Sequence, residues 1–224
     1  MTADPLALGD DALIAAQRLA MWCARAPELE EDVALANIAL DQLGAARLFL
    51  SLVGDEDELA YLRTDRDFRN VLLVELVDRD FAVLIAKLLF LSAFQRLNYA
   101  SLAAGPDRRV AEIAAKAVKE SAYHLDHATQ WTLRLGDGTD LSHQRMQAAV
   151  DEVWPYTHEL FEDATELREP WLSTVDDVLA GATLVRPADG WRPTGGRRGR
   201  HTEALSYLLA ELQVVHRAHP GARW

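Results

Sequence analysis

The hydrophobic and polar positions of the chain follow a helical period, most clearly between residues 107 and 135. At about 100° per residue, the apolar positions of this stretch fall on one side. They are Val110, Ile113, Ala114, Ala117, Val118, Ala128, Trp131 and Leu135. Asp107 follows Gly105-Pro106 and suits the N-cap position, and Gly136 suits the end of the last turn. The pattern predicts one long amphipathic helix over 107–135.

Three more long helices are predicted, over residues 10–25, 28–52 and 81–104. Asp10 is the expected N-cap of the first, which ends before Ala26-Pro27 because the residue before a proline resists the helical conformation. Between Val33 and Leu43 the second helix is apolar nearly all round, which indicates a helix covered on several sides.

The remaining segments predict shorter elements and no strands. Residues 55–80 read as short helical turns and loop, and they form a long crossover between two helix pairs. Additional helices are expected over 142–167, 171–182 and 201–216, with a loop rich in Gly, Pro and Arg over 186–200. Two pairs of long helices joined by a long crossover predict an all-α protein with a single ferritin-like domain over 1–224. In this interpretation a four-helix bundle carries a C-terminal helical extension over 142–217.

Composition and charge narrow the range of partners. The net charge of −12 and the pI of about 5.0 argue against nucleic acid or an anionic membrane as the main partner. Cys23 is the only cysteine, so an intrachain disulfide is excluded, which fits a reducing cytoplasm. The first residues show no signal peptide, and the apolar run from Phe81 to Phe94 is interrupted by Lys87 and too short to span a bilayer. We expect a cytoplasmic protein without membrane contact.

The polar positions inside the predicted bundle can be compared with a di-metal site. Such bundles bind two metal ions with a glutamate from each of two helices and a Glu-x-x-His motif from each of the other two. The inward polar positions are Gln17 on the first helix, Asn37 and Asp41 on the second, Gln95 on the third, and Glu120 and His124 on the fourth. At most two of these are carboxylates, so we predict no metal site and no catalytic residue, and a hydrogen-bonded core network instead. The alternative is a reduced site of Asp41, Glu120 and His124 in a metal-dependent oxidase or oxygenase.

A basic loop is the second candidate feature. The stretch T-G-G-R-R-G-R-H-T-E from Thr194 places Arg197, Arg198 and Arg200 just before a predicted helix, with Thr202 as its cap. Backbone amides, a helix N-terminus and guanidinium groups together suit a phosphate or a carboxylate. The alternative is a solvated loop, or one bound by salt bridges to acidic neighbours.

Five stretches in order resemble the family of C subunits of bacterial phenylacetyl-CoA epoxidase complexes and cover nearly the whole chain. They are L-G-D-D-A-L from Leu8, A-P-E-L-E-E-D-V-A-L-A-N-I-A-L-D from Ala26, K-A-V-K-E-S-A-Y-H-L from Lys116, L-G-D-G-T-D from Leu135 and T-G-G-R-R-G-R-H-T-E from Thr194. The resemblance implies a ferritin-like fold and a non-catalytic structural role beside a homologous A subunit. It further implies that the A subunit holds the di-iron centre and binds the acyl-CoA.

The same resemblance implies the remaining functional expectations. This chain would hold no cofactor, and a reductase with NADPH, flavin and iron–sulfur centres would supply electrons for epoxidation of the phenylacetyl-CoA ring. Gln17, Asn37, Asp41, Gln95, Glu120 and His124 would then be the remains of a lost metal site. Arg197, Arg198 and Arg200 would face CoA phosphates at the subunit boundary or an acidic partner surface. Alone, the chain would self-associate into a homodimer through the face meant for its partner. The exact acyl-CoA and the stoichiometry are not encoded in these motifs.

Overall fold

The computed structural model describes residues 4–222, and within this range all regular secondary structure is helical. The α-helices are α1 (Pro5–Ala20), α2 (Leu29–Leu50), α3 (Glu56–Tyr61), α4 (Leu72–Glu75), α5 (Phe81–Ala103), α6 (Arg108–Gly136), α7 (Asp140–Val153), α8 (Arg168–Gly181) and α9 (Glu203–Ala218). Short 3-10 helices cover Asp65–Asp67, Trp154–Phe161, Thr165–Leu167 and Gly196–Arg198. The predicted all-α class is confirmed.

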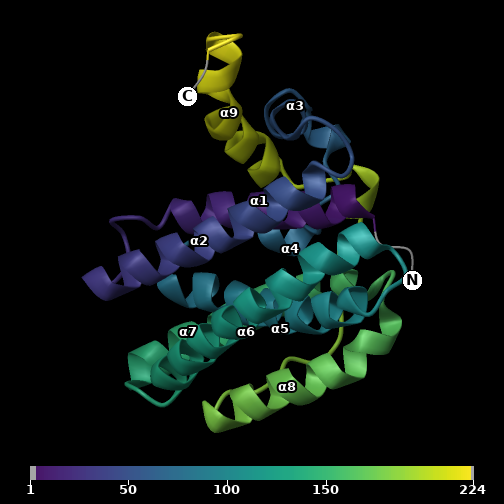
Figure 1. Cartoon of the computed structure of the whole chain (residues 1–224). Helices are drawn as coiled ribbons and strands as arrows, with labels where there is room; N and C mark the ends of the chain where they lie inside the picture. The colour runs from purple at the N-terminus through teal and green to yellow at the C-terminus, as the bar shows by residue number, and fades with distance from the viewer. Residues whose placement is uncertain (1–3, 223–224) are drawn as a thin grey trace. The chain divides into compact units, whose positions relative to one another are not determined.

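The chain divides into two compact units. Among the described residues, the continuous unit is Asp78–Pro193, and the discontinuous unit combines residues 4–77 with residues 194–222. Each unit contains one pair of long neighbouring helices, α1 with α2 in the discontinuous unit and α5 with α6 in the continuous unit (Figure 1). The four long helices expected from the sequence therefore occur as two helical hairpins, each joined by a short connection.

In the discontinuous unit, α1 begins earlier than its sequence pattern suggests. Asp4 is the N-cap and accepts a hydrogen bond from the backbone N–H of Leu6 at 3.0 Å. Pro5 occupies the first turn, where its missing N–H costs nothing. The prediction that Asp10 caps this helix is wrong, since Asp10 lies inside α1 and is 0% exposed. A carboxylate at such a position requires partners, because burying an unpaired charge is costly.

In the continuous unit, α5 and α6 pack against α7 and α8. Helix α6 begins as predicted, with Asp107 accepting hydrogen bonds from the backbone N–H groups of Arg109 and Val110. The predicted helix over 142–167 is wrong: α7 ends at Val153 and the chain continues in 3-10 turns. Pro155 explains this end, because proline has no N–H for the helix and clashes with the preceding turn.

Two helices have the length and composition of membrane spans, α2 and α5, with mean hydropathies of 1.3 and 1.4 over their most apolar windows. Most of that window in α5, 83%, is buried within the protein, as in the core helix of a helical bundle. Only 44% of the most apolar stretch of α2 is buried, so much of the apolar surface of this helix is exposed.

Candidate functional site

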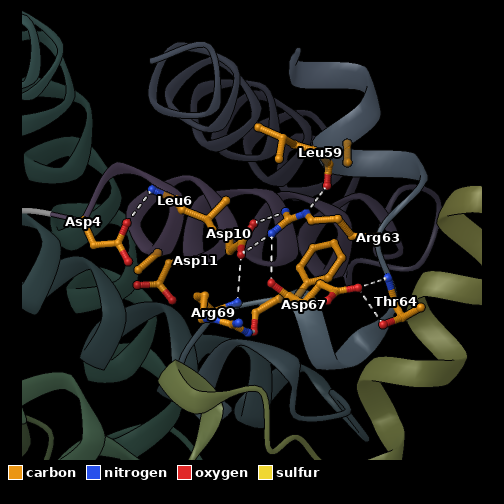
Figure 2. A network of polar contacts seen from close by, with 12 residues as sticks. Asp4, Leu6, Asp10, Asp11, Leu59, Arg63, Thr64, Asp67 and Arg69 are labelled. Atoms are coloured by element: carbon orange, nitrogen blue, oxygen red, sulfur yellow. Dashed lines mark hydrogen bonds and ion pairs between the residues drawn. The ribbon is translucent and has the colours of Figure 1, made fainter. Parts of the chain in front are cut away.

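The first part of the site is an ion pair between Asp10 of α1 and Arg63, which follows α3. Arg63 Nη1 donates to Asp10 Oδ2 at 2.9 Å and Nη2 donates to Oδ1, so the guanidinium binds both carboxylate oxygens (Figure 2). The backbone N–H of Arg69 also donates to Asp10 Oδ2, at 2.8 Å. Arg63 stacks over the Phe68 ring at 4.1 Å, which orients its guanidinium. Asp10 thereby fixes the crossover segment to α1.

A second ion pair joins Asp11 of α1 to Arg197 of the basic loop. Arg197 Nη1 donates to Asp11 Oδ1 at 2.9 Å and Nη2 donates to Oδ2 at 2.7 Å. Arg197 Nη1 also donates to the backbone carbonyl oxygen of Arg69 at 2.7 Å, and the Val71 N–H donates to Asp11 Oδ1 at 2.8 Å. Both side chains are largely buried, with 18% of Arg197 and 7% of Asp11 exposed. Bidentate pairs of this kind are strong and geometrically specific.

The third part of the site surrounds Glu75 of α4, which is 0% exposed. His201 Nδ1 lies 2.8 Å from Glu75 Oε2, and His201 Nε2 lies 3.1 Å from the carbonyl oxygen of Phe68. Both of these neighbours are hydrogen-bond acceptors, so the contact with Glu75 is an ion pair when the imidazole carries both protons. The Thr202 N–H donates to Glu75 Oε1 at 2.6 Å, and Asn70 Nδ2 donates to Oε2 at 2.9 Å. We call the three pairs Asp10–Arg63, Asp11–Arg197 and Glu75–His201 the buried ion-pair network.

The carboxylates of α1 are electrostatically perturbed by their location. Burial raises the pKa of Asp11 above the ordinary aspartate value, and the adjacent Arg197 guanidinium offsets part of that rise. Burial likewise raises the pKa of Asp10, against the opposing effects of Arg63 and of the Arg69 N–H. Each aspartate therefore depends on its arginine to remain charged inside the protein.

The glycines of the basic loop serve close backbone packing in this site. A methyl group added at Gly196 would lie 2.1 Å from the carbonyl oxygen of Asn70. Gly199 has a φ of 69°, and a methyl group there would lie 2.2 Å from the carbonyl oxygen of Arg66. Only glycine permits such an approach of one backbone to another. The loop thus lies directly on residues 66–72, and its glycines are explained without an anion.

Arg197 is directed into the protein, whereas Arg198 and Arg200 are more exposed. Arg197 agrees with the alternative prediction of a loop bound by salt bridges, although the sequence did not identify Asp11 as its acidic partner. The expected contact with CoA phosphates or an acidic partner surface therefore rests on Arg198 and Arg200. One sequence signal for the network was available: Asp10 and Asp11 are adjacent acids within an otherwise apolar run, a position that calls for buried cations.

Three of the six predicted core polar residues lie in the discontinuous unit, where they do not form a cluster. Gln17 is half-buried at a groove between α1 and α2, Asn37 is exposed, and Asp41 is partly exposed. The structure shows no hydrogen bond between these three side chains. Their expected role as fillers of a former metal site stays a prediction.

The other three predicted residues lie in the continuous unit. Gln95 and His124 are buried, with 3% and 2% of their surface exposed. Gln95 Nε2 donates to the Tyr99 hydroxyl at 3.4 Å, one turn further along α5. Glu120 forms its ion pair with Lys116, at 3.1 Å and one turn earlier in α6, and not with His124.

Replacing Glu120 by alanine is expected to lower the free energy of unfolding by less than about 1 kcal/mol, because an i, i+4 ion pair with an exposed lysine contributes little. The Lys116 side chain is 63% exposed and that of Glu120 is 20% exposed. Urea unfolding of Glu120→Ala beside Glu112→Ala, a more exposed carboxylate of α6, measures this. A loss above about 1.5 kcal/mol would show that Glu120 supports a buried network after all.

Neither unit by itself supplies a donor set for a pair of iron ions among its described residues. Within each unit, the described residues contain no group of three or more His, Cys, Asp or Glu side chains placed to hold a metal ion. The two buried acids of α1 are bound to Arg63 and Arg197, and Glu75 is bound to His201. Carboxylates already neutralised by protein cations are poor ligands, so the network fastens segments together and offers no open coordination position.

Comparison with known proteins agrees with the sequence motifs. The sequence model of the family described as phenylacetic acid catabolic protein matches residues 3–224. The chain is 43% identical over 245 residues to the C subunit of the 1,2-phenylacetyl-CoA epoxidase of Escherichia coli (strain K12), in an alignment covering 100% of this chain and 99% of that relative.

Proposed function

Because the chain belongs to the phenylacetic acid catabolic protein family, a ferritin-like all-α family, we propose that it is a structural subunit of a monooxygenase complex. The complex epoxidises the aromatic ring of phenylacetyl-CoA during phenylacetate degradation. The similarity to a C subunit of such an epoxidase supports this assignment, because it extends over 99% of that relative.

In this proposal the chemistry resides in a homologous A subunit. The A subunit holds the di-iron centre and the acyl-CoA, a reductase with NADPH, flavin and iron–sulfur centres supplies electrons, and the complex works in the cytoplasm. The present chain docks on the A subunit and keeps its substrate channel in shape. It contributes no catalytic residue and holds no cofactor.

The observation that carries the proposal is the state of the buried carboxylates. A dinuclear iron site needs four carboxylates and two histidines that converge from four helices. Here Asp10, Asp11 and Glu75 are paired with Arg63, Arg197 and His201, and Glu120 is paired with Lys116. The acidic side chains are used to hold the fold together, which is the property expected of a supporting subunit.

Metal analysis and reconstitution test the proposal together. The chain and an A subunit from the same organism are purified separately and then combined with the reductase. We expect iron to remain with the A subunit, fewer than about 0.1 iron atoms per molecule of this chain, and oxygen-dependent turnover of phenylacetyl-CoA only when both subunits are present.

Two outcomes would overturn the proposal. Stoichiometric iron in this chain that is lost in His124→Ala would favour an oxidase or oxygenase site of Asp41, Glu120 and His124. Full turnover by the A subunit alone would show that no supporting subunit is needed. A matched His143→Ala variant controls for loss of a histidine as such, since His143 lies on α7 in the continuous unit.

A further inference from the structure

An apolar stripe runs along the exposed side of α2. Leu29, Val33, Ala36, Leu40 and Leu43 recur at helical spacing, so they share one side of the helix. Leu29 is 75% exposed, Val33 56%, Leu40 64% and Leu43 38%. At 1.5 Å per residue the stripe is about 21 Å long, or four helical turns. A row of large exposed apolar side chains on one helix marks an interaction site.

The stripe borders a groove of about 370 Å³ within the discontinuous unit. Leu13 and Ala16 of α1 form one wall, and Leu40 and Leu43 of α2 form the other. Tyr61 of α3 and Leu212 of α9 also line it, and the Tyr61 ring is stacked on His216 at 4.5 Å. A groove between two parallel rows of apolar side chains accepts the apolar side of a helix.

The charges around the groove indicate the sign of the charge expected on the partner surface. The exposed side chains Glu28 and Glu30 at the start of α2, Asp57 and Glu58 on α3, and Glu211 on α9 are all acidic. Arg47 pairs with Glu56 at 2.6 Å, whereas Arg217 donates only to backbone carbonyl oxygens and keeps its positive charge. Arg25, in the turn before α2, is exposed as well, but the five acidic side chains outnumber these two arginines. The net charge around the stripe is therefore negative.

We propose that the α2 stripe and its groove bind an amphipathic helix of the A subunit, with an apolar side of about four turns and basic residues along its flanks. This inference rests on the proposed function and specifies which surface makes the docking contact. The negative rim disfavours a second copy of this chain, because a symmetric contact through α2 would bring like charges together. It attracts a basic partner and steers its approach.

The test measures the affinity of the purified full-length chain for a separately purified A subunit from the same organism. Leu40→Glu places a charge in the centre of the stripe, and it leaves the core unchanged because Leu40 is 64% exposed. We expect its Kd for the A subunit to rise at least about tenfold, as for a central interface residue. The matched control is Leu141→Glu on α7 of the continuous unit, where a leucine is 56% exposed, and its Kd should stay within about twofold of wild type.

A second variant tests the negative rim. Glu28→Gln combined with Glu30→Gln removes two exposed charges, and neither glutamate caps α2 through its side chain. We expect slower association with the A subunit and a weaker dependence of the association rate on salt. An unchanged salt dependence would contradict the basic flanks assigned to the partner helix.

The outcomes separate this inference from the proposed function. If wild type binds the A subunit and Leu40→Glu binds equally well, the surface is wrong while the supporting role stands. If Leu40→Glu abolishes only self-association of the isolated chain in sedimentation experiments, a second copy covers the stripe and the inference fails. If wild type does not bind the A subunit at all, both the inference and the proposed function fall.

Discussion

Replacing Arg197 by alanine is expected to lower the free energy of unfolding of the discontinuous unit by about 3–5 kcal/mol. The change leaves the carboxylate of Asp11 buried in α1 without its bidentate partner, and burial of an uncompensated charge is the main cost. It also removes the bond that Arg197 donates to the Arg69 carbonyl oxygen. Urea unfolding followed by tryptophan fluorescence and by hydrogen exchange of α1 measures the loss.

Arg198→Ala is the matched control for this variant. Its side chain lies in the same loop and donates to Thr194 Oγ1 at 3.2 Å, so we expect a change within about 0.5 kcal/mol. The paired variant Arg197→Met with Asp11→Leu removes both charges and should recover much of the loss, because the penalty comes from the unpaired aspartate. Equal stabilities of Arg197→Ala and wild type would show that Asp11 is solvated or otherwise neutralised in solution.

Replacing Glu75 by alanine is expected to have an effect of similar size, again about 3–5 kcal/mol. Glu75 accepts hydrogen bonds from Thr202 N–H and Asn70 Nδ2 and pairs with His201, so its removal leaves three buried donors without their acceptor. We expect residues 194–202 to detach locally before the unit unfolds as a whole. Faster hydrogen exchange and earlier proteolytic cleavage in this segment would measure the detachment.

Glu58→Ala, on the exposed surface of α3, is the control for Glu75→Ala and should leave both measurements unchanged. Exchange in residues 194–202 that is equally slow in Glu75→Ala and wild type would contradict the assigned role of the Glu75–His201 pair.

Local signals in the sequence were sufficient for most of the helices. The predicted helices over 28–52, 81–104 and 107–135 agree with α2, α5 and α6 to within two residues at each end. Their periodicity and caps, such as Asp107, are local features. The helix expected over 142–167 is shorter, because α7 ends at Val153 just before Pro155 and the following turns form a 3-10 helix.

The buried ion-pair network could not be predicted, because its pairs join residues that are distant in the chain. Asp10 and Arg63 are 53 residues apart, and Asp11 and Arg197 are 186 residues apart. Without knowledge of those partners, Asp10 looked like an N-cap at the start of an apolar helix. The role of the loop glycines could not be predicted for the same reason. Gly196 packs against the backbone of residues 70–72, which is far from it in the sequence. Glu120 was expected in the polar network of the core, whereas it is paired with Lys116.

The discontinuous unit has a consequence for synthesis on the ribosome. Asp11 of α1 is translated 186 residues before its counter-ion Arg197, so it leaves the exit tunnel well before that partner exists. The continuous unit, Asp78–Pro193, is complete before that moment and can fold as the chain is still being made. Helices α1 and α4 therefore wait in an unfinished state, and a nascent chain interrupted before Arg197 and His201 are made leaves them exposed to chaperones and proteases.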